Sequence, residues 1–133
     1  MKALALHPFF AAMVAAGEKR VEYRSWNTNY RGYLLICATL KKEEPCFPRG
    51  HALAVAAISR TRQTKDGNWS WYLKDVTPII PVPVKCQQRI FESHIDPSEV
   101  IPLSVEDSYQ LFEYWQSLGL ARDIDSIFAD FQE

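Results

Sequence analysis

The stretch from Gly17 to Arg24 gathers the side chains that are best suited to chemistry. Lys19 comes three positions before Glu22, and Arg24 comes two positions after it, so on a strand Glu22 and Arg24 share one face. A carboxylate acceptor beside two cationic donors suits a ligand that carries both a phosphate and the hydrogen-bonding edge of a base. The same spacing also fits a surface salt bridge on a strand, which contributes little stability.

Trp26 lies directly beyond this group and is our first choice for a residue that stacks on a base. It shares the strand face of Glu22 and Arg24. Aromatic side chains on short strands more often fill a core, so we expect one or two of five aromatic residues to line a cleft and the rest to be buried. The five are Trp26, Tyr30, Trp69, Trp71 and Tyr72.

Further arginines lie outside this group. Arg31 falls in the turn after the strand, and Arg60 and Arg62 alternate at the end of a later strand, where they share a face. They extend a candidate phosphate track, although a solvated strand edge explains them equally well. If the chain binds RNA, we expect phosphate contacts from Lys19, Arg24, Arg31 and Arg60.

Short strand patterns separated by turn residues must position these side chains. Strands are expected over residues 2–6, 19–26, 32–38, 52–58 and 69–77. Residues 65–68 contain an Asp-Gly pair, which indicates a hairpin turn. Three prolines within residues 78–83 indicate an edge strand or an extended connection. Five or six short strands with one early helix predict an α+β fold built on a small barrel over residues 2–91.

Residues 8–16 predict the early helix, with Pro8 in its first turn and Gly17 at its end. Its residues 9–16 are apolar on every side, so we expect this helix to be buried and to plug one end of the barrel. A second helical pattern begins at Ser104 and ends at Gly119.

A short amphipathic helix is expected near the C-terminus, after Asp123. We expect the C-terminal helices to pack outside the barrel, because this much aromatic surface is a liability when exposed. The residues expected to pack there are Tyr109, Phe112, Trp115, Ile127, Phe128 and Phe131.

Length and composition predict one domain over residues 1–133 that contains a real core, since the chain has 133 residues and is 47% hydrophobic. Residues 1–91 carry 14 Lys and Arg against 6 Asp and Glu, whereas the acidic helical extension, residues 92–133, carries 1 against 10. The basic part can attract a polyanion, and the acidic part can fold back and neutralise it. These two interpretations are compatible.

The three cysteines and three histidines are spaced too irregularly for a disulfide framework or a zinc module. Cys46 and His51 are near each other, but no second pair completes four ligands. We therefore expect no metal, no cofactor and reduced thiols. No apolar run reaches the length of a membrane span, so we expect a cytoplasmic protein with no membrane partner.

Several of these features, in their order along the chain, resemble the ASCH domain family, named after activating signal cointegrator homology. The spacing of Gly17, Lys19, Glu22 and Arg24 resembles the family's G-x-K-x-x-E-x-R signature. The preceding helix, the entry to the strand at residues 30–36, and the late strand at residues 71–76 also resemble the family's elements. A proline–lysine element at residues 81–85, ending in Lys85, completes a resemblance that covers about residues 2–91.

This resemblance implies a PUA-like β-barrel with a cleft beside the signature and an RNA-related role. It places Lys85, together with the signature residues, among the candidate ligand contacts. Two positions depart from the family pattern: Cys86 stands where many members have glycine, and Phe91 where they often have tryptophan. The far wall of the cleft is therefore expected to differ in shape.

Three functions stay open at this point. The first is a module that binds RNA or a modified nucleotide through charge and stacking. The second is a hydrolase of the ASCH type, an acetylcytidine amidohydrolase or a ribonuclease, with Lys19 and Glu22 as catalytic residues. The amidohydrolase branch that this chain resembles has threonine where Glu22 stands. The third is an interaction module that binds a protein through its acidic C-terminal helices. Ligand identity and oligomeric state are not predicted.

Overall fold

The structure is a computed structural model that describes residues 1–123. The expected helix after Asp123, and the expected packing of Ile127, Phe128 and Phe131, lie outside the described residues.

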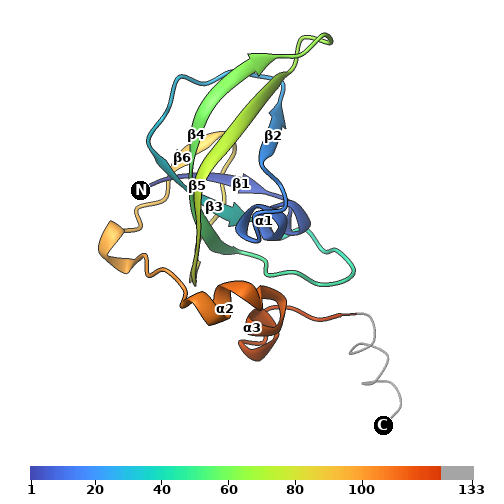
Figure 1. The fold of residues 1–133 in the computed structure, drawn as a ribbon, viewed down its shortest axis with the longest axis vertical. Coiled ribbons are helices and arrows are strands. Elements are labelled where there is room, and N and C mark those ends of the chain that lie inside the picture. The colour runs from blue at the N-terminus through green and yellow to red at the C-terminus, as the bar shows by residue number, and fades with distance from the viewer. Residues whose placement is uncertain (124–133) are drawn as a thin grey trace.

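Within the described residues, six strands form one curled sheet (Figure 1). The strands are β1 (Lys2–Leu6), β2 (Val21–Arg24), β3 (Tyr33–Ala38), β4 (His51–Gln63), β5 (Trp69–Pro83) and β6 (Ile90–Glu92). Their order across the sheet is β2-β5-β4-β3-β1-β6, so β2 and β6 form its two edges. Neighbouring strands are antiparallel except for the parallel pair β1 and β3. This is the small barrel that the sequence predicts, and its backbone ladder stops short of closing between β1 and β2.

The long hairpin of β4 and β5 gives the sheet its curl. Its turn holds the expected Asp-Gly pair, with Gly67 at a φ of +87°. The register between the two strands shifts three times, and such bulges increase local bending. The proline-containing half of β5 pairs with β4 on one side, while Ile79 forms an isolated bridge with Pro102 on the other. The edge-strand interpretation of this stretch is therefore confirmed, because β2 pairs with the first half of β5.

The helix α1 (Pro8–Ala15) lies against the concave side of the sheet and contacts β3, β4 and β5 (Figure 1). Its Ala11, Ala12 and Val14 are fully buried among the residues of the main core. The expectation of burial on every side was wrong for two residues of its first turn, since Phe9 and Phe10 are 43% and 44% exposed. This turn enters from the end of β1 at the rim of the barrel, where the sheet covers one side of the helix.

After β6 the chain passes through η1 (Pro97–Glu99) at the side of the barrel and then forms α2 (Val105–Tyr109) and α3 (Leu111–Ser117) below it (Figure 1). As predicted, the Ser104 hydroxyl caps the first of the two α-helices by accepting the Asp107 N–H at 3.1 Å. The single helix expected up to Gly119 is broken at Gln110, whose φ of −128° is not helical.

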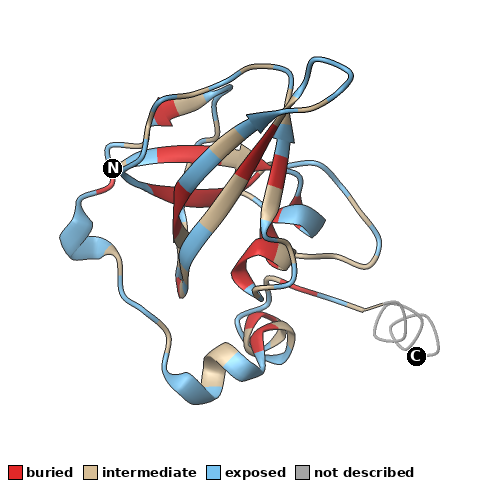
Figure 2. Cartoon of the chain, turned by 45° about the horizontal axis from the view of Figure 1, so that its top comes forward, coloured by how far each residue is buried: buried red, intermediate tan, exposed pale blue. Residues whose placement is uncertain are grey.

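The two helices on either side of this break differ in burial: α3 contains buried residues, drawn red in Figure 2, and α2 contains none. Trp115 is 2% exposed and joins the main core, and Phe112 packs against it, as expected. Tyr109 is 84% exposed, so the expectation that it packs on the barrel was wrong. The reason is that Gln110 resets the helical phase, and Tyr109 no longer shares a face with Phe112 and Trp115.

Candidate functional site

The signature, residues 17–24, begins directly after the end of α1 and continues through β2. Gly17 has a φ of +77°, and its N–H donates to the Val14 carbonyl at 3.0 Å, while the Glu18 N–H donates to the Met13 carbonyl at 2.9 Å. This pair of bonds is a Schellman motif, which ends a helix with a left-handed residue that glycine adopts at the least cost. The first glycine of the signature therefore ends the helix and turns the chain toward β2, which begins at Val21 rather than at Lys19 as the sequence predicted.

Lys19, just before β2, bonds to neighbouring groups of the protein itself. Its Nζ donates to the Val21 carbonyl at 2.7 Å and lies 3.5 Å from Glu22 Oε1. The ammonium also lies 5.1 Å from the Phe10 ring centre and 5.4 Å from the Tyr23 ring centre. Since β2 is an edge strand, Lys19 satisfies a backbone carbonyl close to the open side of the sheet.

Glu22 is the buried carboxylate of the site, with 7% of the residue exposed. Its Oε1 accepts the Tyr23 N–H at 3.1 Å and pairs with Lys19. Its Oε2 accepts two N–H groups of the Arg24 guanidinium, at 3.2 Å from Nε and 2.9 Å from Nη2. Both oxygens of Glu22 are therefore engaged by neighbouring residues, as a buried carboxylate requires.

Arg24 joins the two margins of the incomplete barrel. Besides Glu22, its Nη2 donates to the Ala5 carbonyl of β1 at 2.9 Å. The edge strand β6 pairs with β1 over residues 2–4, so the Ala5 carbonyl lies just beyond the end of that ladder. The Glu22–Arg24 pair thus bridges the seam between β2 and β1 where a backbone ladder would otherwise close the barrel.

A cleft of about 540 Å³ lies along this seam. One wall is formed by the end of β1 and the start of α1. The others are formed by β2 with Trp26, which follows it, and by the loop that precedes β6. The lining residues are Ala5, Leu6, His7, Phe10, Glu22, Tyr23, Arg24, Trp26, Thr39, Gln87, Gln88 and Arg89.

Trp26 is the one of the five candidate aromatic residues that lines this cleft. Its ring meets Trp71 edge-on at 4.7 Å, and its carbonyl accepts the Trp71 indole N–H at 3.3 Å, so a core residue holds it in place. The Arg89 guanidinium lies over the Trp26 ring at 4.6 Å. Of the others, Trp71 is buried, and Tyr30 and Trp69 pack against the core.

The structure brings part of the predicted ligand-contact set together. Glu22, Arg24 and Trp26 line the cleft, whereas Lys19 lines an adjoining hollow.

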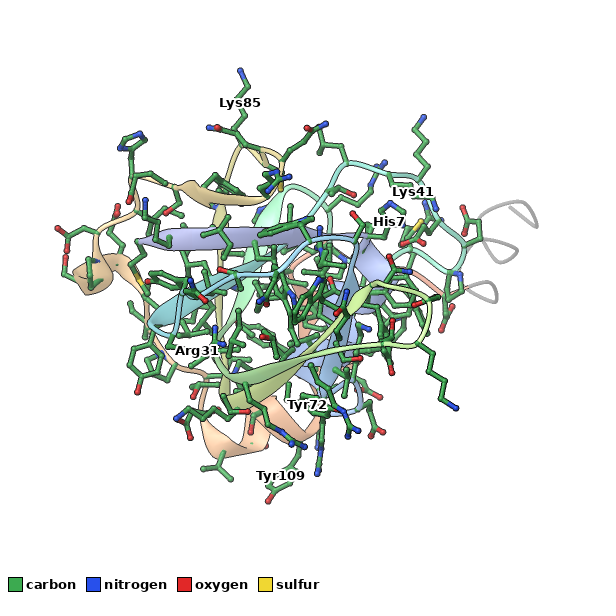
Figure 3. All side chains as sticks on the ribbon, turned by 90° about the horizontal axis from the view of Figure 1, so that it is seen from above. His7, Arg31, Lys41, Tyr72, Lys85 and Tyr109 are labelled. Atoms are coloured by element: carbon green, nitrogen blue, oxygen red, sulfur yellow. The ribbon has the colours of Figure 1, made fainter. Side chains whose placement is uncertain are left out.

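The other predicted basic residues lie elsewhere. Arg31 donates to the carbonyls of Thr28 and Tyr30 in its own turn. Arg60 lies over the Tyr72 ring on the outer surface, 4.2 Å from its centre. Lys85 is exposed and projects away from the body of the molecule, and Arg31 lies well apart from it and from His7 (Figure 3).

Sequence reasoning missed five polar residues that line the cleft: His7, Thr39, Gln87, Gln88 and Arg89. The run from Gln87 to Arg89 carries a signal, since three consecutive polar residues interrupt the apolar pattern between the prolines and β6. Arg89 also has a φ of +60°, which is uncommon for a residue other than glycine.

Cys86 and Phe91, the two positions that differ from the family pattern, are half-buried and buried, respectively. Cys86 is half-buried, and its Sγ lies 3.3 Å from the Ala38 carbonyl. Burial raises the pKa of the Cys86 thiol. Phe91 is 6% exposed and pairs with Ala3 across β6 and β1. Within residues 1–123, no three His, Cys, Asp or Glu side chains are grouped so that they could hold a metal ion.

The family model described as "ASCH domain" matches residues 4–92, which include the signature, the barrel and the cleft. The chain belongs to the ASCH domain family. A segment of 42 residues, or 32% of the chain, is 50% identical to activating signal cointegrator 1 of Homo sapiens. That segment makes up 7% of the human protein, so the chain spans a small part of this curated relative.

Solved ASCH structures show the same fold. The crystal structure of the ASCH protein from Zymomonas mobilis has a TM-score of 0.51 and 16% identity over 92% of this chain and 96% of that one. A mutant of the same protein gives a TM-score of 0.51 and 17% identity over 84% and 96%. The fold is thus the PUA-like barrel that the resemblance implied. Among the described residues, no helix is long and apolar enough to cross a membrane.

Proposed function

We propose that the cleft binds a short single-stranded RNA segment or a modified nucleoside. The observation that carries this proposal is the Trp26–Arg89 pair, with the guanidinium 4.6 Å from the ring centre, in a cleft of about 540 Å³. Pockets of about 300–1,000 Å³ hold small organic ligands. The guanidinium covers one face of the ring, and bases stack on guanidinium planes as well as on aromatic rings, so the pair offers a stacking surface together with a cation for the phosphate.

The polar lining suits a base with hydrogen-bonding edges. Gln87 and Gln88 each offer an amide that donates and accepts, and Thr39 adds a hydroxyl. Exposed single-stranded bases present such edges, whereas paired bases hide them. A duplex is also too wide for a cleft of this volume, so the proposal selects single strands and single nucleosides.

Within this proposal, Glu22 and Arg24 shape the floor of the cleft and Arg89 supplies its accessible cation. The Arg24 side chain is 23% exposed, and its guanidinium bonds to Glu22 and to the Ala5 carbonyl. Arg89 is an exposed residue whose guanidinium rests on Trp26.

A titration of the whole chain tests the proposal. Intrinsic tryptophan fluorescence and calorimetry would be followed while adding single-stranded RNA of a few nucleotides, long duplex RNA, and nucleosides including N4-acetylcytidine. We expect saturable binding of a short strand or a nucleoside that Trp26→Ala weakens. Tight, sequence-blind duplex binding at physiological salt would contradict the proposal, and binding to none of the probes would favour a protein-interaction role.

The hydrolase function is supported by one observation, the 3.5 Å contact between Lys19 Nζ and Glu22 Oε1. A general base must receive a proton from the substrate within hydrogen-bond reach. Both Glu22 oxygens already accept bonds from protein donors, and Lys19 lines the adjoining hollow, so binding explains this geometry better. Incubation with N4-acetylcytidine and with short RNA, followed by mass spectrometry, separates the two. Turnover that Glu22→Gln abolishes would replace the binding proposal with the enzyme.

The protein-interaction function receives less support from the described helices. An exposed Trp115 on a detached helical segment would favour this function. Instead, Trp115 is 2% exposed and lies in the main core.

A further inference from the structure

Two further hollows adjoin the cleft, and Tyr23 lines all three. One, of about 390 Å³, is lined by Tyr23 together with residues that include Phe10, Met13, Glu18, Lys19 and Arg20. The other, of about 480 Å³, lies toward the β4–β5 hairpin turn and includes Lys65. Phe10 is also shared between the first hollow and the cleft. The cleft and the first hollow therefore have a common wall made of two aromatic rings.

These two rings are unusually accessible for large aromatic side chains. Tyr23 is 63% exposed and Phe10 is 44% exposed. Tyr23 holds this position because β2 is an edge strand that pairs with β5 alone, so the side chain stands where the sheet ends. Because side chains alternate along a strand, Tyr23 is on the other face of β2 from Glu22 and Arg24. Glu22 and Arg24 bond to each other, and Arg24 also bonds to Ala5 across the seam.

A cation lies between the two rings. Lys19 Nζ is 5.1 Å from the Phe10 ring centre and 5.4 Å from the Tyr23 ring centre, within the range of a cation–π contact. Arg20 lines the same hollow and is exposed. The Lys19 ammonium already pairs with Glu22 and its side chain is 17% exposed, so the exposed Arg20 is the more accessible cation for a phosphate. An exposed ring beside such a cation matches one nucleotide unit, in which the base stacks on the ring and the phosphate meets the guanidinium.

We propose that the cleft and this hollow are consecutive subsites for one RNA strand of at least two nucleotides. One base stacks on Trp26 in the cleft, the adjacent base stacks on Tyr23, and a phosphate lies near Lys19 and Arg20. This inference rests on the proposed function and narrows it, because it makes an oligonucleotide, rather than a free nucleoside, the preferred ligand.

Ladders of one, two and three adenylates or cytidylates, titrated into the whole chain, test the second subsite. We expect affinity to rise at least tenfold from the mononucleotide to the dinucleotide. Tyr23→Ala should weaken dinucleotide binding by about 5- to 150-fold, the loss for one stacked base, and should weaken mononucleotide binding far less, because Tyr23 also forms part of the cleft wall. Tyr23→Phe should retain the wild-type affinity, because the ring remains.

Two comparisons keep the test specific. Trp26→Ala should weaken the mononucleotide and the dinucleotide alike. Tyr109→Ala, a matched change of an even more exposed tyrosine that lines none of the three hollows, should alter neither. Circular dichroism of each variant reports that the fold is kept.

The outcomes separate this inference from the proposed function. If mononucleotides bind as tightly as dinucleotides, or if Tyr23→Ala weakens both ligands equally, the second subsite is refuted while the cleft proposal stands. If wild-type protein binds none of the ladder, the oligonucleotide inference is overturned. A nucleoside that still binds in a Trp26-dependent manner would then leave the proposed function intact, and its failure as well would overturn both.

Discussion

Glu22 and Arg24 show that signature residues can hold the barrel together while they line the cleft. Two hydrogen bonds join Arg24 to Glu22 within β2, and a third joins Arg24 to the Ala5 carbonyl of β1 across the seam of the barrel. The pair is largely sheltered, since the Arg24 and Glu22 side chains are 23% and 10% exposed. The first effect of changing Arg24 is therefore expected on the seam itself.

Arg24→Ala should lower the free energy of unfolding by about 2–3 kcal/mol, because it leaves the Glu22 carboxylate buried without its main partner. Urea denaturation measures this loss. Adding Glu22→Gln to the variant should recover part of it, because the orphaned charge is then removed. Arg62→Ala, at an exposed arginine of β4, is the matched control, with an expected change within about 0.5 kcal/mol. An equal loss of unfolding free energy for Arg24→Ala and Arg62→Ala would contradict the stabilising role of the Glu22–Arg24 pair at the seam.

Cys37 makes stability depend on alkaline pH. Burial, and then the nearby Cys86, raise the pKa of the Cys37 thiol well above its ordinary value. As pH rises past about 8.5, the unfolded chain loses this proton while the folded chain keeps it. The contribution is therefore fully present below that pH and is lost as pH rises toward the folded pKa.

The stability of the wild-type chain should accordingly fall above pH 8.5 by up to about 1.4 kcal/mol per pH unit from this group. Urea midpoints between pH 7 and pH 10 measure the slope. Cys37→Ala should flatten it, whereas Cys46→Ala, at a half-exposed cysteine, serves as the control. A slope unchanged by Cys37→Ala would show that other groups cause it.

At the scale of elements, a row of aromatic rings connects α3 to the wall of the cleft. Phe112 of α3 meets Phe47, Phe47 meets Phe9, and Phe9 meets Phe10, with 5.6 Å between ring centres at each step. Trp115 of the same helix lies in the main core beside α1 residues. We propose that the helices after residue 92 belong to the same folding unit as the barrel and buttress α1.

Trp115→Ala should therefore cost about 3–5 kcal/mol of unfolding free energy, as expected for a large buried aromatic residue. Truncation after residue 92 should lower the melting temperature or the solubility of the barrel, because it uncovers the apolar surface under α3. Tyr109→Ala should change stability by less than about 0.5 kcal/mol, since that side chain is 84% exposed. A truncated barrel as stable and soluble as the whole chain would make these helices a separate appendage.

At the scale of the whole molecule, charge is divided between a basic and an acidic part. Residues 1–91 carry 14 Lys and Arg against 6 Asp and Glu, and residues 92–133 carry 1 against 10. The two parts nearly cancel at long range, so a broad polyanion track would be screened. The short-range site that we propose, with Trp26 and Arg89 in the cleft and Lys19 in the adjoining hollow, would keep its contacts under such screening.

Binding of a short RNA should therefore weaken only modestly with salt. Arg89→Ala should make the plot of log affinity against log salt shallower by about 0.7, the value for one phosphate contact on a single strand. Trp26→Ala should cost about 1–3 kcal/mol and leave the slope unchanged, because stacking releases no counterions. Titrations at several salt concentrations measure both, and a slope that changes with Trp26 would contradict the assignment of stacking.

Local rules in the sequence determined much of the frame. Gly17 as a helix end, the shared face of Glu22 and Arg24, and the Asp-Gly hairpin each depend on a few neighbouring residues, so their patterns are readable without a fold. The choice of Trp26 followed from the same alternation, and the structure places it in the cleft. The resemblance to the ASCH family, rather than these local patterns, supplied the expectation of a PUA-like barrel with a cleft beside the signature.

The tertiary structure alone decided how the seam closes and which residues surround it. Arg24 bonds to Ala5 and Trp26 meets Arg89 across long stretches of chain, and such contacts depend on how far the bulged β4–β5 hairpin curls the sheet. The same curvature leaves Arg60 on the outer surface although its spacing suggested a shared track. Sequence periodicity reports which face a side chain occupies, whereas closure depends on the summed bending of the whole sheet.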